Sequence, residues 1–158
     1  MSETGARTET LMELLVVSAR LENRRTLLRI LEELPVLVFS AATVEQAREV
    51  LATHSIGLVF CEENLADGSY RDLLKSIRVT QPGAQFVLML CTGEWTEYLE
   101  AVRLGAWDGI RCPLQPTDVE LLLIRSARER QMSFVVPSGS PGQHLSHYYK
   151  AAFGPHAN

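Results

Sequence analysis

The chain has little of what marks several classes of protein. Only three of its 158 residues are cysteine, 7% are aromatic, and basic residues are fewer than acidic ones, 15 against 19. The net charge of −4 offers no basic surface for nucleic acid or for an anionic membrane. No uninterrupted apolar run approaches the roughly 20 residues that a membrane helix needs. We therefore expect neither a nucleic-acid partner nor a membrane partner.

The number and spacing of the cysteines argue against a disulfide framework or a metal site. Their number is odd, they show no CxxC spacing, and they lie within or at the ends of apolar runs, at Cys61, Cys91 and Cys112. This distribution favours reduced thiols in a core over a disulfide framework or a metal site. Reduced thiols, with a polar N-terminal stretch that contains no apolar signal core, predict a cytoplasmic protein.

Apolar residues are plentiful, at 46% of the chain, which is enough for one domain with a substantial core. Five short runs rich in apolar residues predict strands buried on both faces, over about 14–17, 36–39, 56–61, 86–90 and 109–112. The segments that follow them predict helices, from helical spacing or capping signals, over about 22–34, 43–54, 69–80, 96–104 and 117–131.

Strand and helix thus alternate five times, and each connection is long enough for a crossover helix. The pattern predicts an α/β fold with a doubly wound, five-stranded parallel sheet in the order 2-1-3-4-5. Its site would lie at the carboxyl ends of the first and third strands. We expect a polar lead over 1–13, one domain over 14–132, and a tail over 133–158. Pro, Gly and Ser cluster at 137–142 and predict that the tail is flexible.

Three strings within this domain resemble the receiver domain of two-component response regulators, a flavodoxin-like family. The string Gly57–Gly68 is similar to the third strand of a receiver and the loop after it, although Ala66 stands in place of the usual proline. The string Ala101–Asp108 is similar to the turn into the fifth strand, and Cys112-Pro113 stands where the family has Lys-Pro. In order and at nearly the family's spacing, these strings identify a receiver-like domain.

The resemblance implies where a receiver would accept a phosphoryl group, and the residues at those positions differ from the family's. The matching residues are Ser18 and Ala19 for the acidic pair, Glu62 for the phospho-accepting Asp, Thr92 or Cys91 for the hydroxyl residue, and Cys112 for the lysine. Phosphoryl transfer needs a metal held by carboxylates and a cation that neutralises the developing charge. We therefore expect no bound Mg²⁺ or other cofactor, no enzymatic activity, and a degenerate pseudo-receiver.

Two of these positions leave alternatives open. Glu62 either mimics a charged acceptor or is a solvated carboxylate at a strand end, and the second is favoured because acidic side chains are mostly exposed. Cys112 is either a redox-sensitive thiol, with Cys61 and Cys91 near it, or an inert buried thiol, which is the commoner case. The alternative function is a phosphoryl-accepting response regulator that uses a displaced acid such as Glu63 or Asp67.

The expected function is a protein–protein interaction module in bacterial signal transduction of the two-component kind. Its partner would be a signalling protein, or a second copy in a homodimer, docked on the fourth helix, fifth strand and fifth helix. This face gathers more aromatic and apolar residues than a solvated face requires, namely Trp95, Tyr98, Trp107, Gly109 and Leu114. Core packing is the alternative interpretation for half of them. Gly109 also replaces the aromatic residue that rotates when a receiver is activated.

Overall fold

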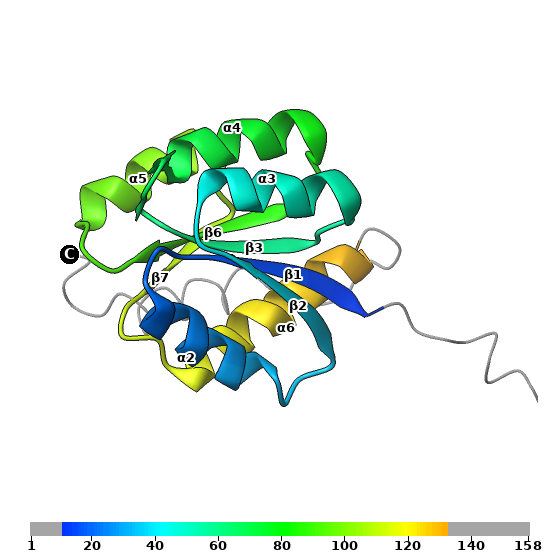
Figure 1. Cartoon of the computed structure of the whole chain (residues 1–158). Helices are drawn as coiled ribbons and strands as arrows, with labels where there is room; N and C mark the ends of the chain where they lie inside the picture. The colour runs from blue at the N-terminus through cyan, green and yellow to red at the C-terminus, as the bar shows by residue number, and fades with distance from the viewer. Residues whose placement is uncertain (1–10, 133–158) are drawn as a thin grey trace, which may run out of the picture.

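The structure, a computed structural model, describes residues 11–132. A five-stranded parallel sheet runs through the middle of the molecule, and helices cover both of its faces (Figure 1). The strands, in order across the sheet, are β2 (Val36–Ala41), β1 (Met12–Val17), β3 (Leu58–Glu62), β6 (Gln85–Leu90) and β7 (Asp108–Arg111). Counting only the strands of this sheet along the chain, the order is 2-1-3-4-5, which confirms the predicted fold.

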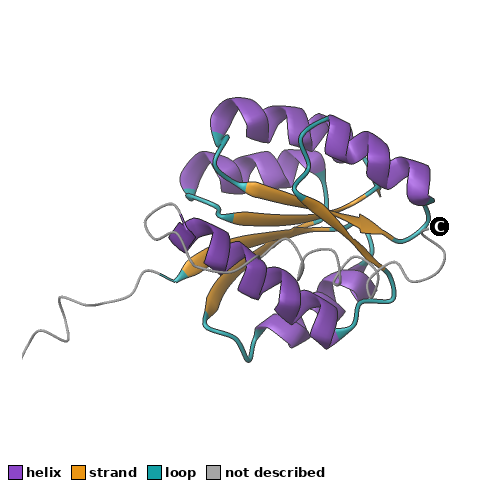
Figure 2. Cartoon of the chain, turned by 180° about the vertical axis from the view of Figure 1, so that it is seen from behind, coloured by secondary structure: helices purple, strands orange, loops and turns teal. Residues whose placement is uncertain are grey.

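The helices form two layers that are visible from either side of the molecule (Figure 2). One face of the sheet carries α3 (Val44–Thr53), α4 (Tyr70–Thr80) and α5 (Trp95–Arg103), and the other carries α2 (Leu21–Leu31) and α6 (Pro116–Met132). Side chains alternate along each strand, so Leu15 packs into the first layer and Leu14 into the second. No helix within residues 11–132 is long and apolar enough to cross a bilayer.

The local signals for helix ends are correct at several places. The Thr43 hydroxyl accepts a hydrogen bond from the Gln46 N–H (3.0 Å) at the start of α3. Ser69 and Asp72 form the expected capping box of α4. Gly105 follows α5 with φ of 115°, the left-handed region that favours glycine. These three signals fix where the chain turns between strands.

Other boundaries differ from the prediction. Strand β1 begins at Met12, so the predicted polar lead ends earlier than residue 13. Helix α6 begins at Pro116, so Thr117 lies inside the helix and does not cap it, because proline fits the first helical position. A small antiparallel pair, β4 (Asn64–Leu65) and β5 (Gly68–Ser69), forms the turn after β3. The predicted tail and the first ten residues lie outside the described residues.

Candidate functional site

The carboxyl ends of the parallel strands meet at one edge of the sheet, and Glu62 is the last residue of β3 there. Its side chain is only 4% exposed. Its Oε1 accepts hydrogen bonds from the Ser18 hydroxyl and from the Ala19 N–H (3.0 Å), and its Oε2 lies 3.4 Å from Nε of Arg20. The favoured prediction of a solvated carboxylate is therefore wrong. Glu62 is a buried carboxylate that the loop after β1 binds and partly neutralises.

The residues at the positions of the acidic pair thus bind Glu62. Ser18 is fully buried, and its hydroxyl oxygen also accepts a hydrogen bond from the Arg20 N–H (3.1 Å). Ala19 contributes only its backbone N–H. Within residues 11–132, no three His, Cys, Asp or Glu side chains are grouped so that they could hold a metal ion. The hydrogen-bond donors at this edge of the sheet therefore bind a carboxylate of the protein itself, that of Glu62.

The next residue, Glu63, is also buried, at 3% exposure, and points to the loop between β6 and α5. Its carboxylate accepts hydrogen bonds from three successive backbone N–H groups: Cys91 (3.1 Å), Thr92 (3.0 Å) and Gly93. Successive N–H groups directed at one point form an anion-binding concavity. A Cβ at Gly93 would lie 2.7 Å from Glu63 Oε2, so glycine permits this close approach. Glu63 fills the concavity as an internal anion.

The two neighbouring carboxylates therefore serve different loops. Glu62 binds the loop after β1, and Glu63 binds the loop after β6. Successive residues at a strand end point to opposite sides, so adjacent carboxylates rarely share one ligand site. Glu63 was expected only as a displaced acceptor, and its hydrogen bonds to the loop after β6 were not predicted. The available signal was a pair of successive carboxylates directly after a fully buried strand.

The cysteines differ from their prediction. A disulfide joins Cys91, just after β6, to Cys112, just after β7, with 4.8 Å between the Cα atoms. The expectation of three reduced thiols is wrong for this pair, because the sheet places the ends of β6 and β7 side by side. Cys61 is a free thiol, and burial raises its pKa well above the ordinary value. It is the inert, buried kind of cysteine.

Comparison with known proteins points to one family. No protein-family model matches the chain. A two-component response regulator from Clostridium difficile has 25% identity and a TM-score of 0.70, with 74% of this chain and 96% of that chain covered. A CheY-like response regulator receiver domain protein from Methanospirillum hungatei has 19% identity and a TM-score of 0.73, with 78% and 99% covered. The described domain has the fold of response-regulator receiver domains.

A curated relative agrees with this assignment. The chain is 29% identical over 91 residues to the response regulator protein PilR of Pseudomonas aeruginosa. The match covers 58% of this chain and 20% of PilR, so the receiver described here corresponds to about a fifth of that relative's length.

The position of the receiver's switch aromatic is Gly109, and the space beside it is already filled. A Cβ built on Gly109 would lie 2.6 Å from Cδ1 of Tyr98. Tyr98, on α5, is 7% exposed, and its hydroxyl lies 3.4 Å from Oδ1 of the buried Asp108. An aromatic ring from the neighbouring helix therefore packs over this strand. Gly109 itself has no side chain to rotate.

Only part of the predicted interaction face lies at the surface. Tyr98, Gly109 and Leu114 are buried, and they contribute to the core instead. Trp95 and Trp107 are half-buried: Trp95 stacks on Tyr98, and Trp107 Nε1 donates to Glu129 (2.9 Å). The large apolar side chains that α5 and α6 expose are Leu99, Val102, Leu121 and Ile124.

The displaced acid Asp67 also has an internal role. Its two carboxylate oxygens accept hydrogen bonds from the N–H groups of Val44 (2.8 Å) and Glu45 (3.1 Å) in the first turn of α3. The hydrogen bond from Val44 is the main reason that the pKa of Asp67 lies below its ordinary value. A carboxylate at a helix N-terminus is a capping arrangement. The Asp67 carboxylate is therefore bound to the first turn of α3 and is separate from the groups that bind Glu62 and Glu63.

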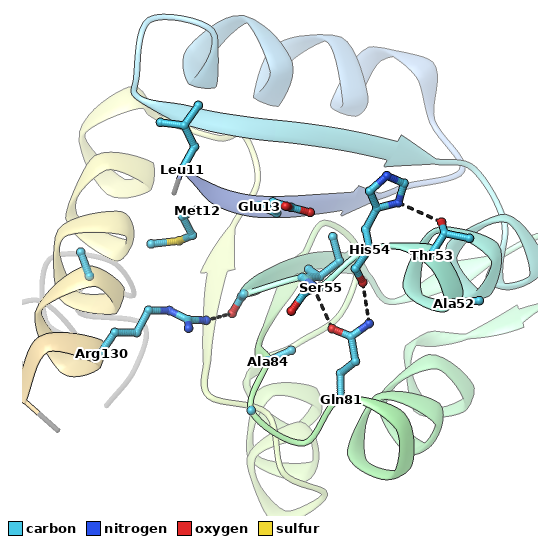
Figure 3. A pocket seen from close by; sticks show the side chains of 14 residues that line it. Leu11, Met12, Glu13, Ala52, Thr53, His54, Ser55, Gln81, Ala84 and Arg130 are labelled. Carbon is cyan, nitrogen blue, oxygen red and sulfur yellow. Dashed lines mark hydrogen bonds between the residues drawn. The ribbon is translucent and has the colours of Figure 1, made fainter. Parts of the chain in front are cut away.

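The opposite, amino end of the sheet contains a hollow of about 820 Å³ (Figure 3). Glu13 of β1 and His54 at the end of α3 line it, and Arg130 of α6 lies on its other side. Oε1 of Glu13 is buried and accepts no hydrogen bond from any described residue. The guanidinium of Arg130 donates to the carbonyl of Gly57. This hollow is at the end of the sheet away from the strand ends that a receiver uses.

Proposed function

We propose that this domain is a pseudo-receiver, a receiver that accepts no phosphoryl group and acts by binding another signalling protein in bacterial signal transduction. One observation carries the proposal. Both carboxylates at the end of β3, Glu62 and Glu63, are buried and bound by donors from the protein itself. An acceptor carboxylate must be free to attack a phosphoryl donor, and a buried, fully engaged one is not.

The chemistry of the surrounding residues supports the same proposal. Mg²⁺ is held by oxygen ligands and usually by one or two carboxylates, which Ser18 and Ala19 do not supply. The lysine that would neutralise phosphoryl oxygens is replaced by Cys112, whose sulfur is in a disulfide. The domain accordingly has no enzymatic activity and needs no Mg²⁺.

The alternative, a phosphoryl acceptor with a displaced acid, finds less support. Asp67 caps α3, and Glu63 is bound by three backbone N–H groups. Either acid would have to break these hydrogen bonds before it reacted. No other observation among the described residues favours this alternative.

The partner surface of the proposal is the face of α5, β7 and α6. Leu99 and Val102 of α5 are 38% and 42% exposed, and Leu121 and Ile124 of α6 are 36% and 55% exposed. Large apolar side chains at the surface of a receiver suit a protein partner. We propose a cytoplasmic signalling protein as the occupant, with a homodimer as the other outcome of the test. Val102→Asp and Ile124→Asp should each weaken the complex, measured by sedimentation of the full chain with and without a candidate partner.

The proposal is tested by incubating the full chain with acetyl phosphate and Mg²⁺ and measuring its intact mass. The expected result is an unchanged mass. The positive control combines Ser18→Asp, Ala19→Asp, Glu62→Asp and Cys112→Lys, which should gain labelling because the fold already brings these positions to one edge. Stoichiometric phosphorylation of the unmodified chain, removed by hydroxylamine as an acyl phosphate would be, would contradict the proposal.

A further inference from the structure

The disulfide lies at the two strand ends through which a receiver contacts its phosphoryl group. Cys112 stands at the lysine position, and Cys91 is beside Thr92 at the hydroxyl position. The Cα separation of 4.8 Å is within the usual range for disulfides. Both residues are half-buried at the strand ends, whereas Cys61 is fully buried.

The fold does not depend on this bond to hold the two strands together. Leu90 and Arg111 are paired in the parallel register of β6 and β7. The N–H of Cys112 also donates to the carbonyl of Leu90 (3.1 Å). Reduction would therefore leave the strand ends neighbouring and the two thiols close enough to form the bond again. Thiols held side by side can form the disulfide again by attack of one thiolate on a mixed disulfide of the other.

The same disulfide is connected directly to the anion-binding loop. The N–H of Cys91 donates to Glu63, as do those of Thr92 and Gly93 after it. Nδ2 of Asn23, on α2, lies 3.5 Å from the Cys91 sulfur. The disulfide thus fixes the first residue of the loop from β7, while Glu63 holds it from β3. Breaking the bond removes one of these two attachments.

We propose that Cys91 and Cys112 form a reversible thiol–disulfide site, which gives this domain a covalent input in place of phosphorylation. A small thiol, as its thiolate, attacks one sulfur, so that the bond between the two cysteines breaks and a mixed disulfide forms. A second thiolate then attacks the mixed disulfide and releases the oxidised small thiol. Overall, two electrons and two protons pass from the two small thiols to Cys91 and Cys112. The reduced domain has a looser loop over residues 91–93.

The test equilibrates the full chain in glutathione buffers of increasing reduced fraction, followed by acid quenching, unfolding, alkylation and intact mass measurement. Because Cys61 is the free thiol, the number of alkyl groups should rise from one to three in a single step. Amide exchange at Thr92 and Gly93 should be about tenfold faster in the reduced form, the size expected of local opening. Cys61→Ala is the matched control and should keep both effects.

Cys91→Ser and Cys112→Ser should each abolish the glutathione-dependent step and give fast exchange in every buffer. Three results would overturn the proposal: three thiols at every glutathione ratio, a disulfide that glutathione never reduces, or reduction that leaves the exchange of Thr92 and Gly93 unchanged. This site adds an input to the proposed function, and acetyl phosphate labelling is therefore measured on both redox forms. If neither redox form is labelled by acetyl phosphate, the pseudo-receiver proposal stands, whether or not glutathione reduces the disulfide.

Discussion

The two ends of the sheet differ in how the buried oxygens of their carboxylates are hydrogen-bonded. At the carboxyl end, Glu62 and Glu63 are each bound by hydrogen-bond donors from a neighbouring loop. At the amino end, Glu13 faces a hollow, and one of its oxygens is buried without a hydrogen-bond partner among residues 11–132. The first arrangement stabilises the charges it buries, while the second leaves part of a charge uncompensated. A buried carboxylate is therefore no guide to function until its partners are known.

The carboxyl end of the sheet also shows how this fold gathers loops around buried charge. The parallel strands bring the loops that follow them to one edge, and that edge holds the carboxylates of Glu62 and Glu63. The charge now belongs to glutamate side chains of the protein, so the loops have their ligand from the moment of folding.

The largest effect on stability should come from Glu62→Ala. The fully buried Ser18 hydroxyl would keep only the Arg20 carbonyl (3.3 Å) as acceptor, and the Ala19 N–H would lose the Glu62 carboxylate, so we expect a loss of about 3 kcal/mol. Urea unfolding followed by circular dichroism measures this loss. The control is Glu32→Ala, a change at an exposed glutamate, which should stay within about 0.5 kcal/mol of the original chain. Equal stability of the two variants would show that Glu62 is not bound as described.

A somewhat smaller loss is expected from Glu63→Ala, about 2 kcal/mol, because Thr92 and Gly93 are exposed enough for water to reach their N–H groups. Glu94→Ala provides the control in the same loop, since Glu94 makes no side-chain cap hydrogen bond to α5. The same unfolding experiment applies. If Glu94→Ala destabilised the domain as much as Glu63→Ala, the role assigned to the Glu63 carboxylate would be wrong.

At the amino end, Glu13→Met should behave in the opposite way. It replaces a carboxylate whose Oε1 has no described partner by an apolar side chain of similar length. We expect unchanged stability or a gain of up to about 1 kcal/mol, because an uncompensated buried polar group is removed. A loss of more than about 1 kcal/mol on thermal or urea unfolding would mean that Glu13 is compensated in the folded protein.

The smallest effect concerns Asp67 and appears only in acid. The pKa of this carboxyl is lowered in the folded protein by the hydrogen bond from Val44. Its contribution is therefore present above the ordinary pKa of about 3.9 and is lost as the pH falls through the lowered value. Asp67→Asn should flatten the pH dependence of the melting temperature below about pH 5. The exposed Glu49→Gln should leave that dependence as it is.

The fold was predictable because strand and helix signals repeat along the chain, and each signal depends on local sequence. The site was predictable in position, since Ser18, Glu62 and Cys112 follow strands whose ends must meet. The contacts within the site were not predictable. The burial of Glu62, the hydrogen bonds of Glu63 and the pairing of Cys91 with Cys112 depend on loops that are distant in sequence. Such contacts are set by tertiary packing, which single-sequence patterns do not encode.

Glu63 occupies the anion-binding loop of the folded protein before any phosphoryl donor is present. NMR-detected amide exchange at Cys91, Thr92 and Gly93, with and without acetyl phosphate and Mg²⁺, measures this occupancy. We expect these amides to be protected before any phosphoryl donor is added, unchanged after it, and unprotected in Glu63→Ala. Amides that exchange freely in the original chain and become protected only when acetyl phosphate and Mg²⁺ are added would contradict it.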